Sequence, residues 1–255
     1  MTMRRGGSSG RVGATMTEGA LSYLTPEAQA RVRIDEMLAA AGWAVQGYGA
    51  VNLAAARGVA VREFVLTPGH GRADYLLFVD GAAVGALEAK KEGETLTGVA
   101  WQTAKYIDGI PDDVPTALEG ALPFVYQSTG TETRFTNTLD PEPTSREVFW
   151  FHRPETLAVW LDEVRRHPAA PTLRHRLRQL SPLDETSLWP AQARAIRNLE
   201  ESLSANRPRS LVQMATGAGK TYTAANVAYR LVRYGDARRI LFLVDRANLG
   251  RQTLK

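Results

Sequence analysis

Cysteine is absent from this chain of 255 residues, so the chain forms no disulfide and binds no metal through thiolates. It also has no apolar run close to the roughly 20 residues that a membrane-spanning helix needs. The first residues include arginine, but no apolar segment follows them, so the pattern of a secretory signal is missing. Together these absences favour a cytoplasmic protein that does not engage a membrane.

Lysine is scarce as well, since arginine outnumbers it 26 to 5. With abundant alanine, this bias is more typical of genome base composition than of DNA-binding chemistry. The net charge of +4 and the isoelectric point near 9.5 are compatible with a nucleic-acid partner but do not by themselves indicate one. The hydrophobic share of 44% and the charged share of 23% are those of an ordinary globular protein with one large or two small domains.

The most informative segment is a glycine-containing loop at residues 213–221. It lies between an apolar run at 210–214, predicted to be a strand, and a stretch at 221–232, predicted to be a helix. Glycines let backbone amides and the helix N-terminus face phosphate groups. We expect Lys220 to reach the β- and γ-phosphates of ATP and the Thr221 hydroxyl to bind Mg²⁺. The other expected nucleotide-binding residues of the loop are Thr216, Gly217, Ala218 and Gly219. The alternative is a glycine-rich turn without a ligand.

Ordered structure is predicted to begin after a Gly/Ser/Thr-rich tail, residues 1–20, which we expect to be disordered. Thr25 fits a helix N-cap, Pro26 the first helical position and Gly42 the helix end. Further strands are predicted at 43–48, 61–66, 74–79, 82–89, 123–127, 133–136, 147–151 and 240–244. Further helices are predicted at 96–107, 155–166 and 190–203, with one helical turn near 173–180.

A candidate metal site follows from a predicted β-hairpin, whose turn is indicated by the pair Asp80-Gly81. Side chains alternate along a strand, so Glu88 and Lys90 share one face, and hairpin pairing brings Asp74 beside them. Carboxylate oxygens suit Mg²⁺, which lowers the pKa of a bound water, while an amine neutralises a phosphate or positions the water. The alternative is a solvated strand face with ordinary charges.

The predicted helix at 96–107 adds two polar side chains to this site. Gln102 and Tyr106 are four residues apart, so they lie on the same helical face. We expect them to contact a substrate phosphate or to orient the metal site. A fourth carboxylate is expected from the first helix, where Glu27 and Asp35 are the candidates.

The pattern Asp74…Glu88-Ala-Lys90, followed by Gln102-x-x-x-Tyr106, resembles the core of the PD-(D/E)xK nucleases in the form that carries a Q-x-x-x-Y helix. The stretches 24–38 and 74–92 resemble, more specifically, the motor/restriction (R) subunit of type I restriction–modification enzymes. The proline of the nuclease motif is replaced by Ala73. Lys91, the alternative to Lys90 as the catalytic lysine, is expected on the opposite face of the strand.

The C-terminal part resembles the motor of superfamily 2 helicases and translocases. Met214 stands where a strict phosphate-binding loop has glycine, as in motif I of that superfamily. Gln192 lies where a glutamine reads the adenine edge, although Ala191 replaces the usual aromatic neighbour. The stretch 241–252 resembles motif Ia, in which Arg246 and Gln252 are candidates for contacts with the DNA backbone.

These resemblances imply an α/β fold: a restriction-endonuclease-like mixed sheet with flanking helices, followed by the first part of a RecA-like P-loop domain. The expected domains are a disordered tail (1–20), a nuclease domain (21–166), a linker (167–187) and part of a motor domain (188–255). A complete motor also needs a second Mg²⁺-binding acid and an arginine finger. Neither is found here, so the chain is expected to be part of a larger protein or a truncated reading frame.

By the same resemblance, the function is that of an endonuclease and ATP-dependent DNA translocase subunit of a type I restriction enzyme. Such a subunit cleaves unmodified double-stranded DNA with Mg²⁺ after ATP-driven translocation, and it works with modification (methyltransferase) and specificity subunits. One alternative is a nuclease–helicase fusion from another DNA repair or anti-phage system. Another is a catalytically silent fragment that binds DNA or its partner subunits.

Overall fold

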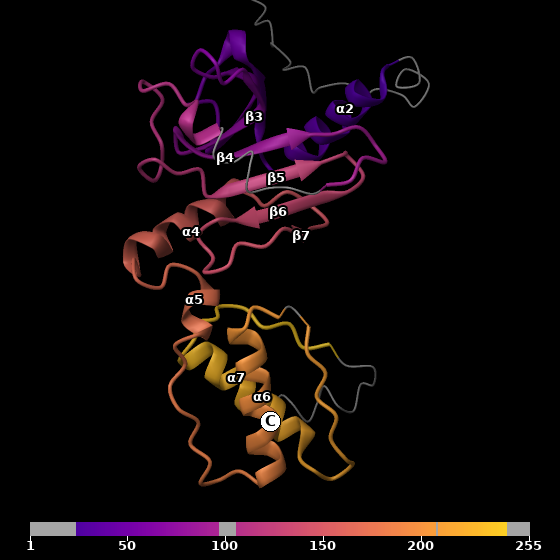
Figure 1. Ribbon diagram of the computed structural model, residues 1–255, viewed down its shortest axis with the longest axis vertical. Helices are drawn as coiled ribbons and strands as arrows, with labels where there is room; N and C mark the ends of the chain where they lie inside the picture. The colour runs from indigo at the N-terminus through magenta and orange to yellow at the C-terminus, as the bar shows by residue number, and fades with distance from the viewer. Residues whose placement is uncertain (1–23, 97–105, 208, 244–255) are drawn as a thin grey trace, which may run out of the picture. The chain divides into compact units, whose positions relative to one another are not determined.

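The computed structural model describes residues 24–96, 106–207 and 209–243, which form two compact units (Figure 1). The first unit comprises the described residues up to Thr136 together with Ser145–Glu155, and the second comprises Asn137–Thr144 and the described residues from Thr156 onward. The elements are α2 (Pro26–Ala40), β1 (Ala44–Gly47), the 3₁₀ helix η1 (Tyr48–Ala50), β2 (Gly58–Val65), β3 (Arg72–Val79), β4 (Ala82–Ala89), β5 (Phe124–Ser128), β6 (Thr133–Asn137), β7 (Arg146–Glu147), α4 (Pro154–Arg166), α5 (Leu173–Leu177), α6 (Pro190–Ser204) and α7 (Lys220–Arg233).

A seven-stranded mixed sheet with the strand order β1-β2-β3-β4-β5-β6-β7 forms the first unit. Strand β1 pairs parallel with β2 and β4 pairs parallel with β5, whereas β2–β3, β3–β4 and β6–β7 are antiparallel. The mixed sheet with flanking helices is therefore confirmed. The predicted strand at 147–151 is shorter than expected, because only Arg146 and Glu147 pair with β6.

Helix α2 begins and ends as its sequence predicts. The Thr25 hydroxyl accepts a hydrogen bond from the Ala28 N–H, at 3.3 Å, and Pro26 occupies the first turn. After the helix the chain turns through Gly42, whose φ of +91° favours glycine. The helix buries Ala30, Ile34 and Leu38, and it packs beside β1 and β4.

The β3–β4 hairpin has the predicted two-residue turn, in which Asp80 and Gly81 both have positive φ, at +49° and +82°. The pairing then shifts by one residue, since Phe78 lies opposite Ala83 but Leu77 lies opposite Gly85. Val84 is the extra residue of this β-bulge. Beyond it the register runs through Tyr75 and Leu87, and one residue further it puts Asp74 level with Glu88.

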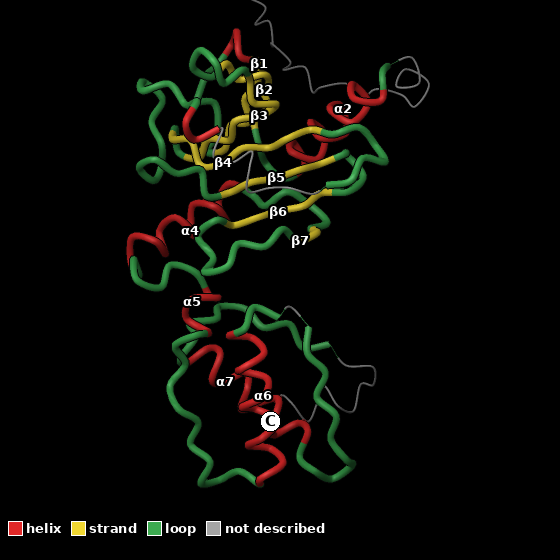
Figure 2. The backbone as a smooth tube through the Cα atoms, in the orientation of Figure 1, coloured by secondary structure: helices red, strands yellow, loops and turns green. Residues whose placement is uncertain are grey.

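The second unit contains helices and loops, and from residue 156 onward the described residues form no strand (Figure 2). Two strand predictions are therefore wrong for the described residues: 210–214 and 240–243 have no regular secondary structure, and residue 244 lies outside the described residues. A segment becomes a strand only with a hydrogen-bonded neighbour, and both segments are open to solvent, with Leu211 93% and Leu241 82% exposed. Among the described residues, no helix has the length and apolar content that crossing a bilayer requires.

Candidate functional site

Asp74, near the start of β3, is held by contacts to both of its carboxylate oxygens. Oδ2 accepts a hydrogen bond from the backbone N–H of Ala89, at 2.9 Å, and Oδ1 accepts one from Nη2 of Arg31, also at 2.9 Å. Burial raises the pKa of the Asp74 carboxyl, and the Ala89 N–H and the Arg31 charge offset this rise only in part. The carboxylate is thus fixed in orientation and largely withdrawn from water.

Glu88 and Lys90 form an ion pair at the end of β4. The Lys90 Nζ lies 2.5 Å from Oε1 of Glu88, and Gln127 Nε2 on β5 donates to Oε2, at 3.2 Å. Glu88 is only 7% exposed, whereas Lys90 is partly open to solvent. The hydrogen bond to Glu88 raises the pKa of the Lys90 ammonium above its ordinary value, so this lysine stays a cation well above neutral pH. The backbone N–H of Lys90 donates to the Ser128 carbonyl, at 2.8 Å, which fixes the strand end.

Tyr106 completes the part of the predicted site that lies in the described residues, because Gln102 falls outside them. The Tyr106 side chain is 7% exposed and packs in an apolar cluster with Phe64 and Leu76. Burial raises the pKa of the Tyr106 phenol, and the charges of Glu88 and Asp74 raise it further. The structure therefore brings Asp74, Glu88, Lys90 and Tyr106 into one electrostatic neighbourhood.

Sequence reasoning did not predict two charged residues beside Asp74. Arg31 on α2 bonds Asp74, pairs with Glu27 at 3.0 Å and makes a short contact with Oε1 of Glu63 on β2. Glu63 has a φ of +52°, which is strained for a residue with a side chain. The four-residue spacing of Glu27 and Arg31 is a visible signal of helical pairing, whereas no sequence pattern marks Glu63.

A cavity of about 300 Å³ opens beside Asp74. Its lining residues are Arg31, Gly47, Tyr48, Arg62, Glu63, Asp74 and Tyr75. Asp35 lies next to this group, where its Oδ1 accepts from the Tyr75 hydroxyl at 2.8 Å and its Oδ2 pairs with Arg62 at 2.9 Å. Of the two candidates for a fourth carboxylate, Glu27 is the one that shares Arg31 with Asp74.

The donor set around Asp74 and Glu88 fits a hard divalent cation. Both residues offer carboxylate oxygens from adjacent strands, and such oxygens are the ligands that Mg²⁺ prefers. Glu88 is buried, and burial raises the pKa of Asp74. A cation bound between them would therefore stabilise the charged form of carboxylates that have lost part of their hydration.

The glycine-containing loop of the second unit leads into α7. Gly217 and Gly219 have φ values of +82° and +79°, and Gly219 is the residue that precedes the helix. Lys220 Nζ folds back and donates to the carbonyls of Met214 and Ala215, at 3.4 and 3.1 Å. A Cβ added at Gly217 would meet nothing within 4 Å, so glycine is needed there for its backbone conformation. The loop fits a phosphate cradle at a helix N-terminus.

Gln192, the candidate adenine reader, lies buried against this loop. Its Oε1 accepts from the Trp189 N–H at 3.0 Å, and its Nε2 donates to the Ala218 carbonyl at 3.2 Å. A Cβ added at Gly219 would lie 2.3 Å from this same nitrogen. The amide of Gln192 thus ties the start of α6 to the glycine-containing loop.

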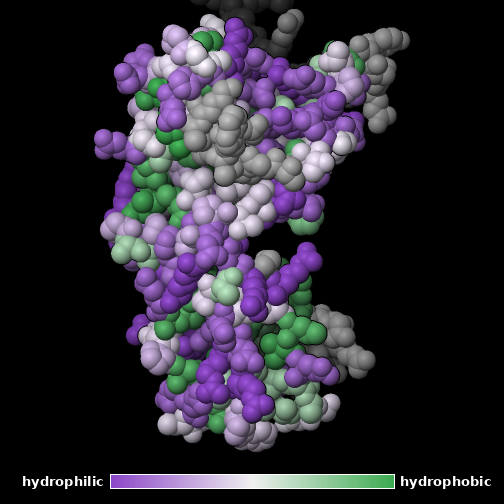
Figure 3. Space-filling model, in the orientation of Figure 1, coloured by the Kyte–Doolittle hydropathy of each residue, from purple (hydrophilic) through white to green (hydrophobic). Residues whose placement is uncertain are grey.

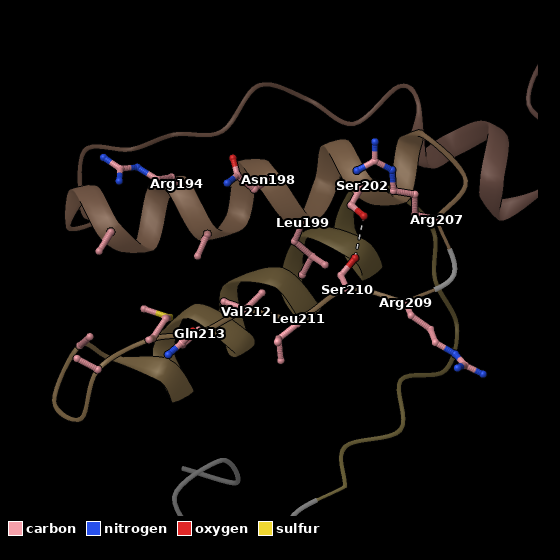
Figure 4. Close-up of a pocket in the computed structure, with 15 residues that line it drawn as sticks. Arg194, Asn198, Leu199, Ser202, Arg207, Arg209, Ser210, Leu211, Val212 and Gln213 are labelled. Atoms are coloured by element: carbon pink, nitrogen blue, oxygen red, sulfur yellow. Dashed lines mark hydrogen bonds between the residues drawn. The ribbon is translucent and has the colours of Figure 1, made fainter.

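A cavity of about 640 Å³ lies between α6 and the extended segment that precedes the loop (Figure 4). The hydroxyls of Ser202 and Ser210 bridge its two sides at 2.8 Å. Apolar side chains, among them Leu211 and Leu243, are exposed in this unit, and Figure 3 shows apolar patches on its surface. Arg246 and Gln252, the candidates for contacts with the DNA backbone, lie outside the described residues.

Comparisons with known proteins match this chain to subunits of restriction enzymes. A family model described as "Type III restriction enzyme, res subunit" matches residues 185–255. The type I restriction enzyme EcoKI endonuclease subunit of Escherichia coli (strain K12) is 28% identical over 89% of this chain and 23% of its own length. The EcoAI endonuclease subunit of Escherichia coli is 47% identical over 24% of this chain and 8% of its own length.

A solved fragment of a putative HsdR subunit of a type I restriction enzyme from Vibrio vulnificus YJ016 is 21% identical. The match covers 82% of this chain and 38% of that one, with a TM-score of 0.39. The sequence matches show that this chain is similar to the endonuclease subunits of type I restriction enzymes, which confirms the resemblance seen in the motifs. The chain spans about a quarter of the length of the EcoKI subunit.

Proposed function

We propose that this chain is part of an endonuclease and ATP-dependent DNA translocase subunit of a type I restriction enzyme. Its first unit carries a Mg²⁺-dependent site for cleaving unmodified double-stranded DNA, and its second unit carries an ATP site. The hydrogen bond from the Ala89 N–H to Asp74, which brings Asp74 beside the strand end where Lys90 pairs with Glu88, supports the nuclease assignment. A solvated strand face is disfavoured, because Glu88 is buried rather than exposed.

In the nuclease site, Asp74 and Glu88 would hold the metal. The bound Mg²⁺ supplies Lewis acidity that lowers the pKa of a water and stabilises charge on the phosphate. The protein supplies orientation: the Ala89 N–H holds one oxygen of Asp74, and Gln127 holds one oxygen of Glu88.

Lys90 and Tyr106 supply charge and protons beside these carboxylates. Lys90, kept as a cation by Glu88, is placed to neutralise the phosphate or to hold the water. Burial and the charges of Glu88 and Asp74 raise the pKa of Tyr106 above its ordinary value, so its phenol stays protonated well above neutral pH and can donate a hydrogen bond. Gln102 is proposed to act on the same substrate phosphate.

In the ATP site, Lys220 would leave the carbonyls of Met214 and Ala215 for the phosphates, while Thr221 contacts the Mg²⁺ that accompanies ATP. The backbone from Thr216 to Gly219 would surround the phosphates. For Gln192 to read adenine, its amide must share or release the bonds to Trp189 and Ala218. We propose that the complete enzyme acts in the cytoplasm with modification and specificity subunits.

The nuclease assignment is tested with the change Asp74→Asn in a complex assembled with those subunits. Loss of the carboxylate charge should reduce Mg²⁺-dependent cleavage of unmodified DNA by more than about 100-fold, because metal and charge stabilisation contribute several kcal/mol. The matched control is Asp80→Asn at the hairpin turn, which should retain activity because Asp80 pairs only with the exposed Arg57 in the contacts described. Unchanged cleavage by Asp74→Asn would remove the assignment.

A further inference from the structure

Arg31 links three acidic side chains in the first unit. Its Nη2 lies 2.9 Å from Oδ1 of Asp74 and 3.0 Å from Oε1 of Glu27, and its Nη1 contacts Oε1 of Glu63. Its Nε is buried and has no acceptor among the described residues. The N–H donors of the guanidinium are therefore divided among three carboxylates, and no single carboxylate receives all of them.

Asp74 is the point where this group meets the candidate metal site. On one side its carboxylate interacts with the charges of Glu88 and Lys90, and on the other it bonds Arg31. Since the Ala89 N–H already occupies Oδ2, Oδ1 is the oxygen that carries the arginine, and a cation at Asp74 must share or take that oxygen.

We propose that Arg31 is a positioning residue that competes with the divalent cation for Oδ1 of Asp74. When the cation binds, the guanidinium moves onto Glu63 and Glu27, which already hold it. This inference rests on the proposed role of Asp74 as a metal ligand. It assigns Glu63 a use as the acceptor that holds the displaced arginine, beside a cavity with room for the side chain to shift.

The charge of Arg31 favours a role in competing with the cation for Asp74 over a role in holding the fold together. A guanidinium next to Asp74 repels a divalent ion, and a partly buried place screens that repulsion less than open water does. An arginine that served only to orient Asp74 would not need two further acids, since the Ala89 N–H already fixes the carboxylate. With Glu63 and Glu27 present, the arginine has somewhere to go without losing its ion pairs.

The experiment measures Mn²⁺ binding to the full 255-residue chain by calorimetric titration, with thermal unfolding recorded in the absence of metal. Arg31→Met should bind Mn²⁺ about tenfold more tightly than the unchanged chain, equivalent to about 1.4 kcal/mol, while unfolding at a lower temperature. Arg31→Lys should lie between the two, because a point charge cannot bridge Asp74 and Glu63 as the planar fork does. A purely structural arginine would lower the unfolding temperature without tightening Mn²⁺ binding.

The matched control is Arg33→Met on the same helix, which removes an arginine paired with Glu92 at 2.9 Å and should leave Mn²⁺ affinity unchanged. If Arg31→Met does not fold, Glu63→Gln provides a second test. Arg31 then loses its contact with Glu63 and pairs more strongly with Asp74, so Mn²⁺ binding should weaken severalfold. Mn²⁺ affinity that is lost in Asp74→Asn but unchanged or weaker in Arg31→Met overturns the competition alone. Affinity that survives Asp74→Asn overturns the metal-ligand role as well.

Discussion

At the scale of single residues, His152 shows how burial decides protonation. Its Nδ1 lies 2.7 Å from the Tyr126 hydroxyl, and its carbonyl accepts from Trp43 Nε1 at 2.9 Å. Burial lowers the pKa of His152 to about 4, and the charge of Arg146 adds to the effect. The imidazole is therefore neutral in the folded protein across the whole range in which an exposed histidine titrates.

The folded chain should lose stability as the pH falls from about 6.5 to 4. In that window the unfolded chain takes up a proton at His152 that the folded chain does not, so the free energy of unfolding decreases, by about 1.4 kcal/mol for each pKa unit of difference. Below pH 4 both states are protonated and this contribution is lost. Urea unfolding between pH 4 and pH 8 measures the slope.

The variant His152→Gln isolates this effect from that of Asp35 and Asp74, whose raised pKa values favour the folded state as the pH falls. The variant should be less stable at pH 8, because it lacks the contact between His152 and the Tyr126 hydroxyl. Its free energy of unfolding should, however, change less with pH. Equal slopes for both proteins would show that His152 is not the titrating group.

The same scale explains which site residues sequence could reveal. Glu88 and Lys90 are two residues apart on a strand, and alternation alone puts them on one face. Arg31 and Asp74 are 43 residues apart in the chain, and no local pattern indicates that helix α2 brings one to the other. Glu63 and Arg31 are also far apart in the sequence. The contacts of Arg31 with Glu27, Glu63 and Asp74 could therefore be found together only in the three-dimensional structure.

At the scale of elements, the close approach of β4 and β5 supports the site. Gly85 lies on β4, and an added Cβ would come within 1.9 Å of the Phe124 carbonyl on the neighbouring strand. The two strands run parallel from Gly85 to Ala89 and hold Glu88 beside Gln127. Glycine is thus required at this position for space, next to the bulge at Val84.

Gly85→Ala should therefore destabilise the first unit by at least about 2 kcal/mol, because the backbone of two strands has to separate. It should also weaken Mn²⁺ binding, since Glu88 moves with its strand. The control Gly47→Ala on β1, where a Cβ would meet nothing within 4 Å, should unfold within about 0.5 kcal/mol of the unchanged chain. Chemical denaturation of both variants provides the comparison.

Element predictions succeeded where the signal was local. Helix α2 begins after Thr25 and ends before Gly42, and Asp80-Gly81 forms the β3–β4 turn, as the sequence predicted. Such caps and turns depend on only a few adjacent residues. The predicted strands at 210–214 and 240–244 have apolar runs of the right length, yet strand formation depends on a partner that a run of residues does not specify. The bulge at Val84 depends on how the whole hairpin packs, and the sequence did not indicate it.

At the scale of the whole molecule, each candidate site is built from the residues of one unit. The proposed metal site draws on Asp74, Glu88 and Lys90 from the first unit, and the proposed nucleotide site on Gln192 and Lys220 from the second. No described residue contributes to both sites. The family model matches residues 185–255 and the EcoKI subunit matches 89% of the chain, so the sequence similarity extends over both units.

The two activities should accordingly be separable by single substitutions. Lys220→Ala should weaken binding of MgATP by about 10- to 100-fold, because a charge-assisted bond to phosphate is lost, while Mn²⁺ binding without nucleotide stays unchanged. Asp74→Asn should show the reverse. The affinities of MgATP and Mn²⁺ for each variant are measured by equilibrium titration. Lys91→Ala, which replaces an exposed lysine of the first unit, is the control and should leave MgATP binding unchanged. Retained MgATP affinity in Lys220→Ala would contradict the nucleotide site.

The bulge at Val84 implies that the hairpin can be paired in a second, more regular way. Counting back from the tight turn without an extra residue, Asp74 would face Leu87, and Glu88 would point through the opposite side of the sheet. A molecule trapped in that arrangement would have the same strands and nearly the same circular dichroism as the native one. Because the residues of β4 from Ala83 to Ala89 are buried, that slip would also re-sort the packing of the sheet, and it would separate Glu88 from the face that carries Asp74.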